Sequence, residues 1–143
     1  MKFIKVGGST EAFLKAGPTQ PFVLCVGERK NIIQSFYIVL DQKFADVACD
    51  NVTAMLNGSI NTPFNPTSIF ASIEVPRFKA SRVKKLNVVM VIQKNNISNC
   101  TDPSLKNLTQ ALHTGITYSC KDVPESQIQE CGAKPEIACG ACW

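Results

Sequence analysis

The chain has 143 residues, of which 45% are hydrophobic and 18% charged, and its formal net charge is +4. This length accommodates one domain with a hydrophobic core, and the composition excludes a disordered chain. The positive charge is concentrated in one stretch with few aromatic residues, a pattern that does not favour a general nucleic-acid-binding protein.

The first part of the chain predicts three strands and one short helix. The stretch "KFIKV" (2–6) reads as a short strand, and "TEAFLKA" (10–16) as a helix that Ser9 or Thr10 caps. Two apolar runs rich in β-branched and aromatic residues, 21–27 and 32–40, predict further strands.

The hydrophobic period then changes and predicts an amphipathic helix over 44–56, which Asn57 and Gly58 end. Its apolar residues recur at helical offsets. They are Phe44, Val47, Ala48, Val52, Met55 and Leu56.

The second half predicts two strands, a helix and a last strand. The run "IFASIEV" (69–75) reads as a strand that Pro76 ends, and "LNVVMVI" (86–92) as a central, buried strand. Asp102 or Thr101 caps a helix over 103–112, and "ITYSC" (116–120) follows as a short strand.

From residue 32 the predicted order is strand, helix, strand, strand, helix, strand. This order is typical of the ferredoxin-like split β-α-β arrangement, an α+β fold with an antiparallel four-stranded sheet and two helices on one face. We therefore expect an extension at 1–30, the α+β domain at 31–119, and a tail at 120–143. Because the tail has few large apolar residues, we expect disulfides rather than a core to hold it.

Cysteine is abundant for a chain of this length, and this favours an oxidising compartment in which disulfides persist. The odd count leaves one thiol unpaired within the chain. The Cys139–Cys142 pair also allows zinc binding or redox chemistry, although no helix follows it and no second pair has suitable spacing. The seven residues expected in disulfides or left over are Cys25, Cys49, Cys100, Cys120, Cys131, Cys139 and Cys142.

N-glycosylation acceptor patterns are also in excess, since roughly one would be expected by chance for this composition. Asn96 and Asn99 are close enough that two glycans would crowd each other, so we expect one of them to be occupied. The five candidate residues are Asn51, Asn57, Asn96, Asn99 and Asn107.

No targeting or membrane signal accompanies these patterns. The first residues, "MKFIKVGGST", lack the apolar region of a signal peptide, and no stretch approaches the length of a membrane span. We therefore expect an extracellular or cell-surface location as a piece of a larger protein, without direct insertion into a membrane.

The positive charge gathers between Pro76 and Leu86. At a hairpin tip such a run is usually solvated and protects the next strand from edge pairing. The alternative is a contact with an anionic polysaccharide, and we expect no nucleic acid as partner. The candidate residues are Arg77, Lys79, Arg82, Lys84 and Lys85.

Three stretches together resemble a SEA domain, an extracellular module, over residues 36–118. They are "SFYIVLDQKFADVACDNVTAML", "SIEVPRFKASRVKKLNVVMVIQ" and "TDPSLKNLTQALHTGITY". The resemblance implies a glycosylated stalk of a receptor, mucin or adhesion protein. Many such domains cleave themselves at a Gly-Ser bond, but Ala80-Ser81 stands here, and alanine does not tolerate the strained backbone that glycine allows. We therefore expect no cleavage.

No pattern of catalytic residues stands out. His113 is the only histidine, and its place near a helix end is explained by the helix dipole. The acidic residues Asp41, Asp46, Asp50 and Glu74 show no spacing typical of metal binding or paired-acid catalysis. We therefore predict no catalytic residue, no metal and no cofactor.

The sequence thus favours a non-enzymatic extracellular glycoprotein module for adhesion or receptor-stalk support, with other extracellular domains or glycans as partners. One alternative is an intracellular or virion-associated structural protein with zinc-bound or reduced cysteines. The other is a glycan- or nucleic-acid-binding domain that uses the basic stretch 77–85.

Overall fold

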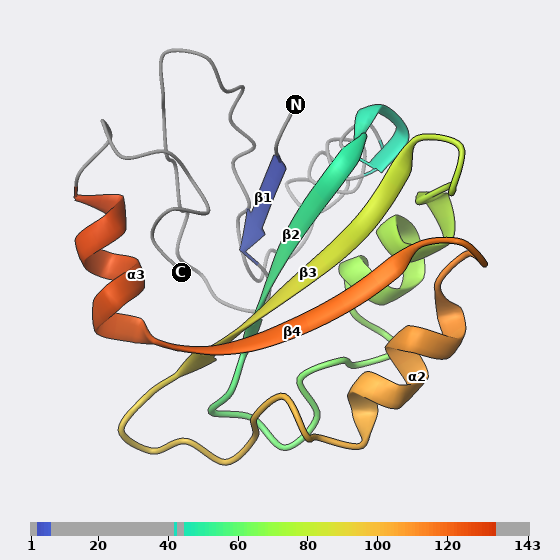
Figure 1. Ribbon diagram of the computed structural model, residues 1–143. Coiled ribbons are helices and arrows are strands. Elements are labelled where there is room, and N and C mark those ends of the chain that lie inside the picture. Colours follow the sequence, from blue (N-terminus) through green and yellow to red (C-terminus); the bar gives the residue numbers. More distant parts are fainter. Residues whose placement is uncertain (1–2, 7–41, 43–44, 134–143) are drawn as a thin grey trace, which may run out of the picture.

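The computed structural model describes residues 3–6, 42 and 45–133, and its elements are labelled in Figure 1. The helical turns η1 and η2 are π-helical and 3₁₀-helical, respectively. The elements are β1 (Phe3–Val6), β2 (Asp50–Asn57), η1 (Phe70–Glu74), η2 (Val75–Arg77), β3 (Val83–Ile92), α2 (Ser104–Ala111), β4 (Thr117–Pro124) and α3 (Glu125–Gly132).

The four described strands form one sheet in the order β1-β2-β3-β4, and every neighbouring pair is parallel (Figure 1). Leu86 at the centre pairs with Val52 of β2 and with Tyr118 of β4. Parallel neighbours need long crossover connections. The connection between β2 and β3, residues 58–82, is called the first crossover here, and the one between β3 and β4, residues 93–116, the second. The α+β class is as predicted, but the antiparallel, ferredoxin-like arrangement is wrong.

The predicted helix over 44–56 is wrong because most of this segment is β2. Residues 45–47 are helical, but the helix does not continue. Asp50 has a left-handed φ of 55°, and the pairing register of β2 with β3 shifts between Asp50 and Asn51. The five residues from Val52 to Leu56 are all buried, since both faces of the strand are covered. A strand buried on both faces is continuously apolar, so its match to helical offsets was accidental.

The predicted strand over 69–75 is also wrong, because these residues wind into η1 and begin η2. Ser68 Oγ accepts a hydrogen bond from Ala71 N (3.1 Å), which satisfies a free amide at the start of the turn. Pro76 is tolerated because the first residues of a helical turn need no N–H. Packing of Phe70 and Val75 into the core outweighs the β-propensity of the neighbouring isoleucines.

The other predicted strands and helices that fall within the described residues are present. The strands at 2–6 and 86–92 are β1 and β3, and the helix over 103–112 is α2, preceded by Asp102. The last strand is β4, which runs on to Pro124 through the predicted boundary at 119/120 and leads into α3. The predicted elements at 10–16, 21–27 and 32–40 lie outside the described residues.

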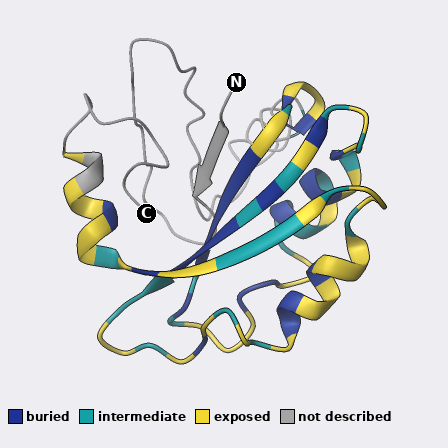
Figure 2. Cartoon of the chain, viewed as in Figure 1, coloured by how far each residue is buried: buried dark blue, intermediate teal, exposed yellow. Residues whose placement is uncertain are grey.

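The sheet is packed on both faces (Figure 2). One face carries the larger core, in which Leu86, Val88 and Met90 of β3 meet Phe70 and Phe78. Leu105 and Leu108 of α2 join the same core. On the other face a smaller cluster joins Met55, Val89 and Val123 to Ile128 of α3. No helix within the described ranges is long and apolar enough to cross a membrane.

Candidate active site

Three phenylalanines hold the crossover between β2 and β3 against the larger core. Phe64 meets Phe70 edge-on, with ring centroids 6.0 Å apart, and Phe70 lies 6.5 Å from Phe78. All three are at most 5% exposed. Edge-to-face and tilted contacts add to the apolar burial, so the rings fix where the turns η1 and η2 lie.

Polar side chains before η1 set its entry angle. Asn65 Oδ1 accepts hydrogen bonds from Thr67 N (2.9 Å) and Thr67 Oγ1 (2.8 Å). The hydroxyl of Ser72 donates to Ser68 O (2.7 Å), one turn earlier. Together with the Ser68 cap, these bonds define the backbone up to the last residue of η1.

That last residue is Glu74, whose side chain is 0% exposed. It is the only acidic residue that is buried within the described part of the chain. The flanking Val75 and the nearby Phe78 are also buried, and Phe78 N donates to Glu74 O (3.2 Å). Removing a carboxylate from water is costly, so a fully buried glutamate marks a candidate functional residue.

The irregular backbone supports this interpretation. A π-helical turn leaves the usual hydrogen-bond ladder of an α-helix, and such turns occur frequently at functional sites. A carboxylate in this position can act as a nucleophile, as a general base or as a partner of a developing positive charge.

The basic stretch lies immediately after this turn, and its two arginines are engaged in the fold. Arg82 donates from Nη1 to Asp46 O (2.8 Å) and from Nη2 to Arg77 O (2.9 Å), while Arg77 Nε lies 3.6 Å from Asp46 Oδ1. Lys79 and Lys84 are exposed, and Lys84 Nζ donates to Ala80 O (3.1 Å). A polyanion site at residues 77–85 stays a prediction, with the lysines as its accessible part.

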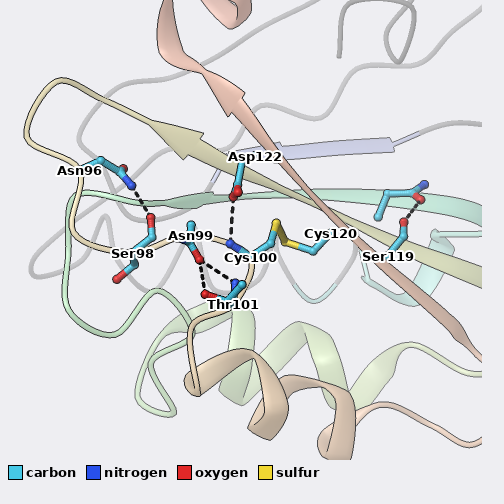
Figure 3. Close-up of a disulfide and its surroundings, with 9 residues drawn as sticks. Asn96, Ser98, Asn99, Cys100, Thr101, Ser119, Cys120 and Asp122 are labelled. Carbon is cyan, nitrogen blue, oxygen red and sulfur yellow. Dashed lines mark hydrogen bonds between the residues drawn. A yellow bond between two sulfur atoms is a disulfide. The ribbon is translucent and has the colours of Figure 1, made fainter.

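Among the cysteines, Cys100 and Cys120 form a disulfide that ties the second crossover to β4 (Figure 3). Cys100 N also donates to Asp122 Oδ1 (2.9 Å). Cys49, half-buried, is a free thiol in the structure. The side chain of Cys131 and the whole of Cys25, Cys139 and Cys142 lie outside the described residues.

The glycosylation candidates differ in exposure, and their occupancy stays a prediction. Asn51, Asn99 and Asn107 are exposed, whereas Asn57 and Asn96 are half-buried.

The other residues weighed for chemistry do not converge on one site. His113 is exposed, and its Nδ1 accepts a hydrogen bond from Ala80 N (3.4 Å). Asp46 and Asp50 are exposed, and Asp41 lies outside the described residues. In the described ranges, no three His, Cys, Asp or Glu residues lie close enough to hold a metal ion.

Sequence reasoning missed Glu74 because it looked for pairs of acidic residues at fixed spacing. The signal that was present is a single acidic residue within the largely apolar run "IFASIEV". An acidic residue that the surrounding packing must bury is more informative than one in a polar loop.

Comparison with known proteins identifies the family. The family model described as ADP-ribosyl cyclase matches residues 23–140. The rat protein named ADP-ribosyl cyclase/cyclic ADP-ribose hydrolase 1 is 38% identical over 95 residues, which cover 64% of this chain and 31% of the relative.

Solved structures agree with the sequence match. The apo structure of porcine CD38 superimposes with a TM-score of 0.58 at 30% identity, covering 64% of this chain and 43% of that chain. Porcine CD38 in complex with a covalent intermediate, ribo-F-ribose-5′-phosphate, gives a TM-score of 0.60 at 29% identity, covering 66% and 42%. The matched region thus spans about a third of the rat relative and less than half of the structural ones.

These findings overturn the predicted SEA resemblance and the function derived from it. A SEA domain has an antiparallel sheet, whereas the described strands are all parallel. Within the described residues, the predicted helix at 44–56 is largely β2 and the predicted strand at 69–75 is largely η1. The expectation of a non-enzymatic adhesion or stalk module is wrong as well, since the relatives are named for enzymatic activities. The chain belongs to the ADP-ribosyl cyclase family.

Proposed function

We propose that this chain carries the reactive carboxylate of an ADP-ribosyl-transfer site and that Glu74 supplies it. The observation that carries the proposal is the complete burial of Glu74 at the end of the π-helical turn, between apolar neighbours. The substrate class is a dinucleotide in which ADP-ribose is linked through its anomeric carbon to a leaving group.

The relatives support this chemistry. The rat protein is named as both a cyclase and a hydrolase of ADP-ribosyl compounds, and porcine CD38 forms a covalent intermediate with a ribose phosphate. A covalent ribosyl intermediate requires a nucleophile on the enzyme, and carboxylates serve in this role at anomeric carbons.

The proposed reaction has two steps. A carboxylate oxygen of Glu74 attacks ribose C1′, a C–O bond forms, and the C1′–N bond to the leaving group breaks. The electron pair of that bond neutralises the positively charged ring nitrogen, and the base departs uncharged. A second nucleophile then displaces the carboxylate from C1′. Water, which loses a proton, gives the hydrolysed product, and a nitrogen of the adenine ring gives the cyclic one.

The packing around Glu74 suits these steps. Phe70 and Phe78, four residues before and four residues after Glu74, are buried in the larger core, so the core side of this segment is apolar. In a dry environment the attraction between a carboxylate and a positively charged ribosyl centre is much stronger than in water. The same environment protects a covalent intermediate from premature hydrolysis.

We further propose that the chain works in an extracellular or lumenal compartment. The disulfide between Cys100 and Cys120 supports this, because disulfides persist in oxidising compartments and are rare in the cytosol.

The test is turnover of nicotinamide adenine dinucleotide, followed by chromatography of the released nicotinamide, cyclic ADP-ribose and ADP-ribose. We expect Glu74→Gln to lower kcat/KM by at least about 10³-fold, since the amide keeps the shape but loses the nucleophile. The matched control is Glu130→Gln, which changes an exposed glutamate of α3 and should leave turnover unchanged.

Two outcomes would contradict the proposal. One is a wild-type chain that folds cooperatively but releases no nicotinamide. The other is a folded Glu74→Gln variant that retains the activity of the wild type.

A further inference from the structure

Two asparagines with complete acceptor patterns, Asn96 and Asn99, lie shortly before the disulfide residue Cys100. Their side chains have different surroundings (Figure 3). Asn96 is half-buried and Asn99 is exposed. The sequence alone left both open as glycosylation sites, because both patterns are complete. The surroundings of each amide group separate them.

The amide of Asn96 is used inside the fold. Its Nδ2 donates to Ser98 O, and its Oδ1 accepts from Gln93 N (3.4 Å). A Cβ built on Gly58 would collide with Asn96 Oδ1 and would lie 2.6 Å from Val91 O. The amide therefore fills a space in which a single methyl group would not fit.

This space is the junction between the loop that follows β2 and the loop that follows β3. Ile97 N and Ser98 N both donate to Gly58 O (2.9 and 2.8 Å), and Ser98 Oγ donates to Ile60 O (2.6 Å). Gly58 N in turn donates to Val91 O (2.9 Å). A sugar on Asn96 Nδ2 would displace the loop that these bonds hold.

Asn99 has the opposite arrangement. Its Oδ1 accepts from Thr101 N (2.8 Å) and from the Thr101 hydroxyl, so the oxygen faces its own turn. Both residues are exposed. The oxygen of the amide is thus engaged locally, and a substituent on Nδ2 projects from an exposed side chain.

We infer that Asn99 carries an N-linked glycan and that Asn96, three residues before it, stays unmodified in the folded protein. In the transfer step Asn99 Nδ2 attacks the anomeric carbon of an oligosaccharide linked to a lipid pyrophosphate. A C–N bond forms, the C–O bond to the pyrophosphate breaks, and the amide nitrogen loses one proton. The lipid pyrophosphate is the leaving group.

The inference requires that the chain enters the secretory lumen, but it does not depend on the activity of Glu74. Asn107 provides an internal reporter of entry. It is exposed on α2, and its acceptor pattern includes the exposed Thr109.

The experiment secretes the full chain from a eukaryotic host behind a cleavable signal. Occupied sites are identified after enzymatic deglycosylation in heavy-oxygen water, which converts each glycosylated asparagine into a labelled aspartate. Cleavage after Lys94 and Lys106 puts Asn96 and Asn99 on one peptide, so fragment ions compare them directly. We expect at least about tenfold higher occupancy at Asn99 than at Asn96.

Variants separate a fold effect from an acceptor effect. Asn99→Gln should remove this glycan without transferring it to Asn96. Asn96→Gln should keep the glycan on Asn99 but lower the secreted yield relative to Asn95→Gln, an exposed neighbour outside any acceptor pattern. If Asn96→Gln does not fold, the occupancy ratio in the wild type and in Asn99→Gln still decides.

Three results would overturn the inference. They are a glycan on Asn96 in the folded secreted protein, a bare Asn99 beside an occupied Asn107, and a secreted chain without any glycan.

Discussion

The two crossover connections pack on the same face of the sheet but are built differently. The first, residues 58–82, winds through a π-helical and a 3₁₀-helical turn and contains the fully buried Glu74. The second, residues 93–116, contains the regular α-helix α2 (Figure 1), with Asp102 in front of it. A disulfide ties this crossover to β4 (Figure 3).

The difference separates a crossover that carries the candidate site from one whose features stabilise the folded state. A buried charge and an irregular helix both cost free energy, and such costs concentrate at functional sites. A capped helix and a disulfide both lower the free energy of the folded state relative to the unfolded chain. We therefore expect changes in the first crossover to affect activity and stability together, and changes in the second to affect stability alone.

The largest effect should come from truncating the aromatic row. Phe78→Ala should lower the free energy of unfolding by about 3–5 kcal/mol, since Phe78 is 0% exposed and its loss leaves a cavity beside Glu74. The matched variant Leu108→Ala, on α2 in the same core, should cost about 2–5 kcal/mol.

Activity distinguishes these two variants. We expect folded Phe78→Ala to lose turnover and folded Leu108→Ala to keep it, as measured under conditions in which urea titration shows both to be native. Equal activity losses in both variants would remove the proposed distinction between the crossovers.

The next largest effect concerns the disulfide. It closes a loop with a sequence separation of 20 residues, so replacing both cysteines, Cys100→Ser with Cys120→Ser, should cost about 3 kcal/mol in urea unfolding. Turnover of the folded variant should not change. Cys49→Ser removes a free thiol instead, and a stability loss as large as that of the double variant would refute the assigned role of the disulfide.

The smallest effect concerns Asp102, whose side chain accepts from Ser104 N (2.9 Å) and Ser104 Oγ (2.6 Å). Partial burial raises the pKa of Asp102, but hydrogen bonds from Ser104 and Ser98 outweigh this and hold the pKa below its ordinary value of 3.8. A lowered pKa means that the ionised form stabilises the folded state above pH 3.8 and that this stabilisation is lost as the pH falls through the lower folded value.

We therefore expect Asp102→Ala to cost about 1 kcal/mol at neutral pH. The difference from the wild type should narrow on acidification below pH 4, as followed by urea titrations at several pH values. A difference that widens with falling pH would contradict this role of Asp102.

Strand β3 and the second crossover after it were also the part that sequence reasoning predicted well. The run at 86–92 and the helix over 103–112 are both present, because a central strand is continuously apolar and the helix has an Asp-Pro start. These are local sequence signals, and the tertiary packing of both elements agrees with them.

Strand β2 and the first crossover after it were mispredicted for a physical reason. A strand buried on both faces and an amphipathic helix can share the same apolar positions, so 44–56 read as a helix although Asp50–Asn57 is β2. The opposite error at 69–75 followed from its isoleucines, whose β-propensity is weaker than core packing. Because a strand was read as a helix and a helical segment as a strand, the predicted element order matched an antiparallel fold, whereas the described sheet is parallel.

The candidate site was not predictable from spacing, because Glu74 does not belong to a recognisable sequence motif. Its burial arises because the turns η1 and η2 pack Phe70, Val75 and Phe78 into the larger core. Only the fold shows that this glutamate is buried while Glu130 of α3 is exposed.

The most direct test of Glu74 as the nucleophile is covalent trapping. The wild-type chain is incubated with a fluorinated ribosyl donor, a substitution that slows the loss of the ribosyl group, and its intact mass is measured. We predict a mass increase of one ribosyl phosphate group that peptide mapping places on Glu74, and no increase in Glu74→Gln. A label on another residue, or the same mass increase in Glu74→Gln, would contradict the account.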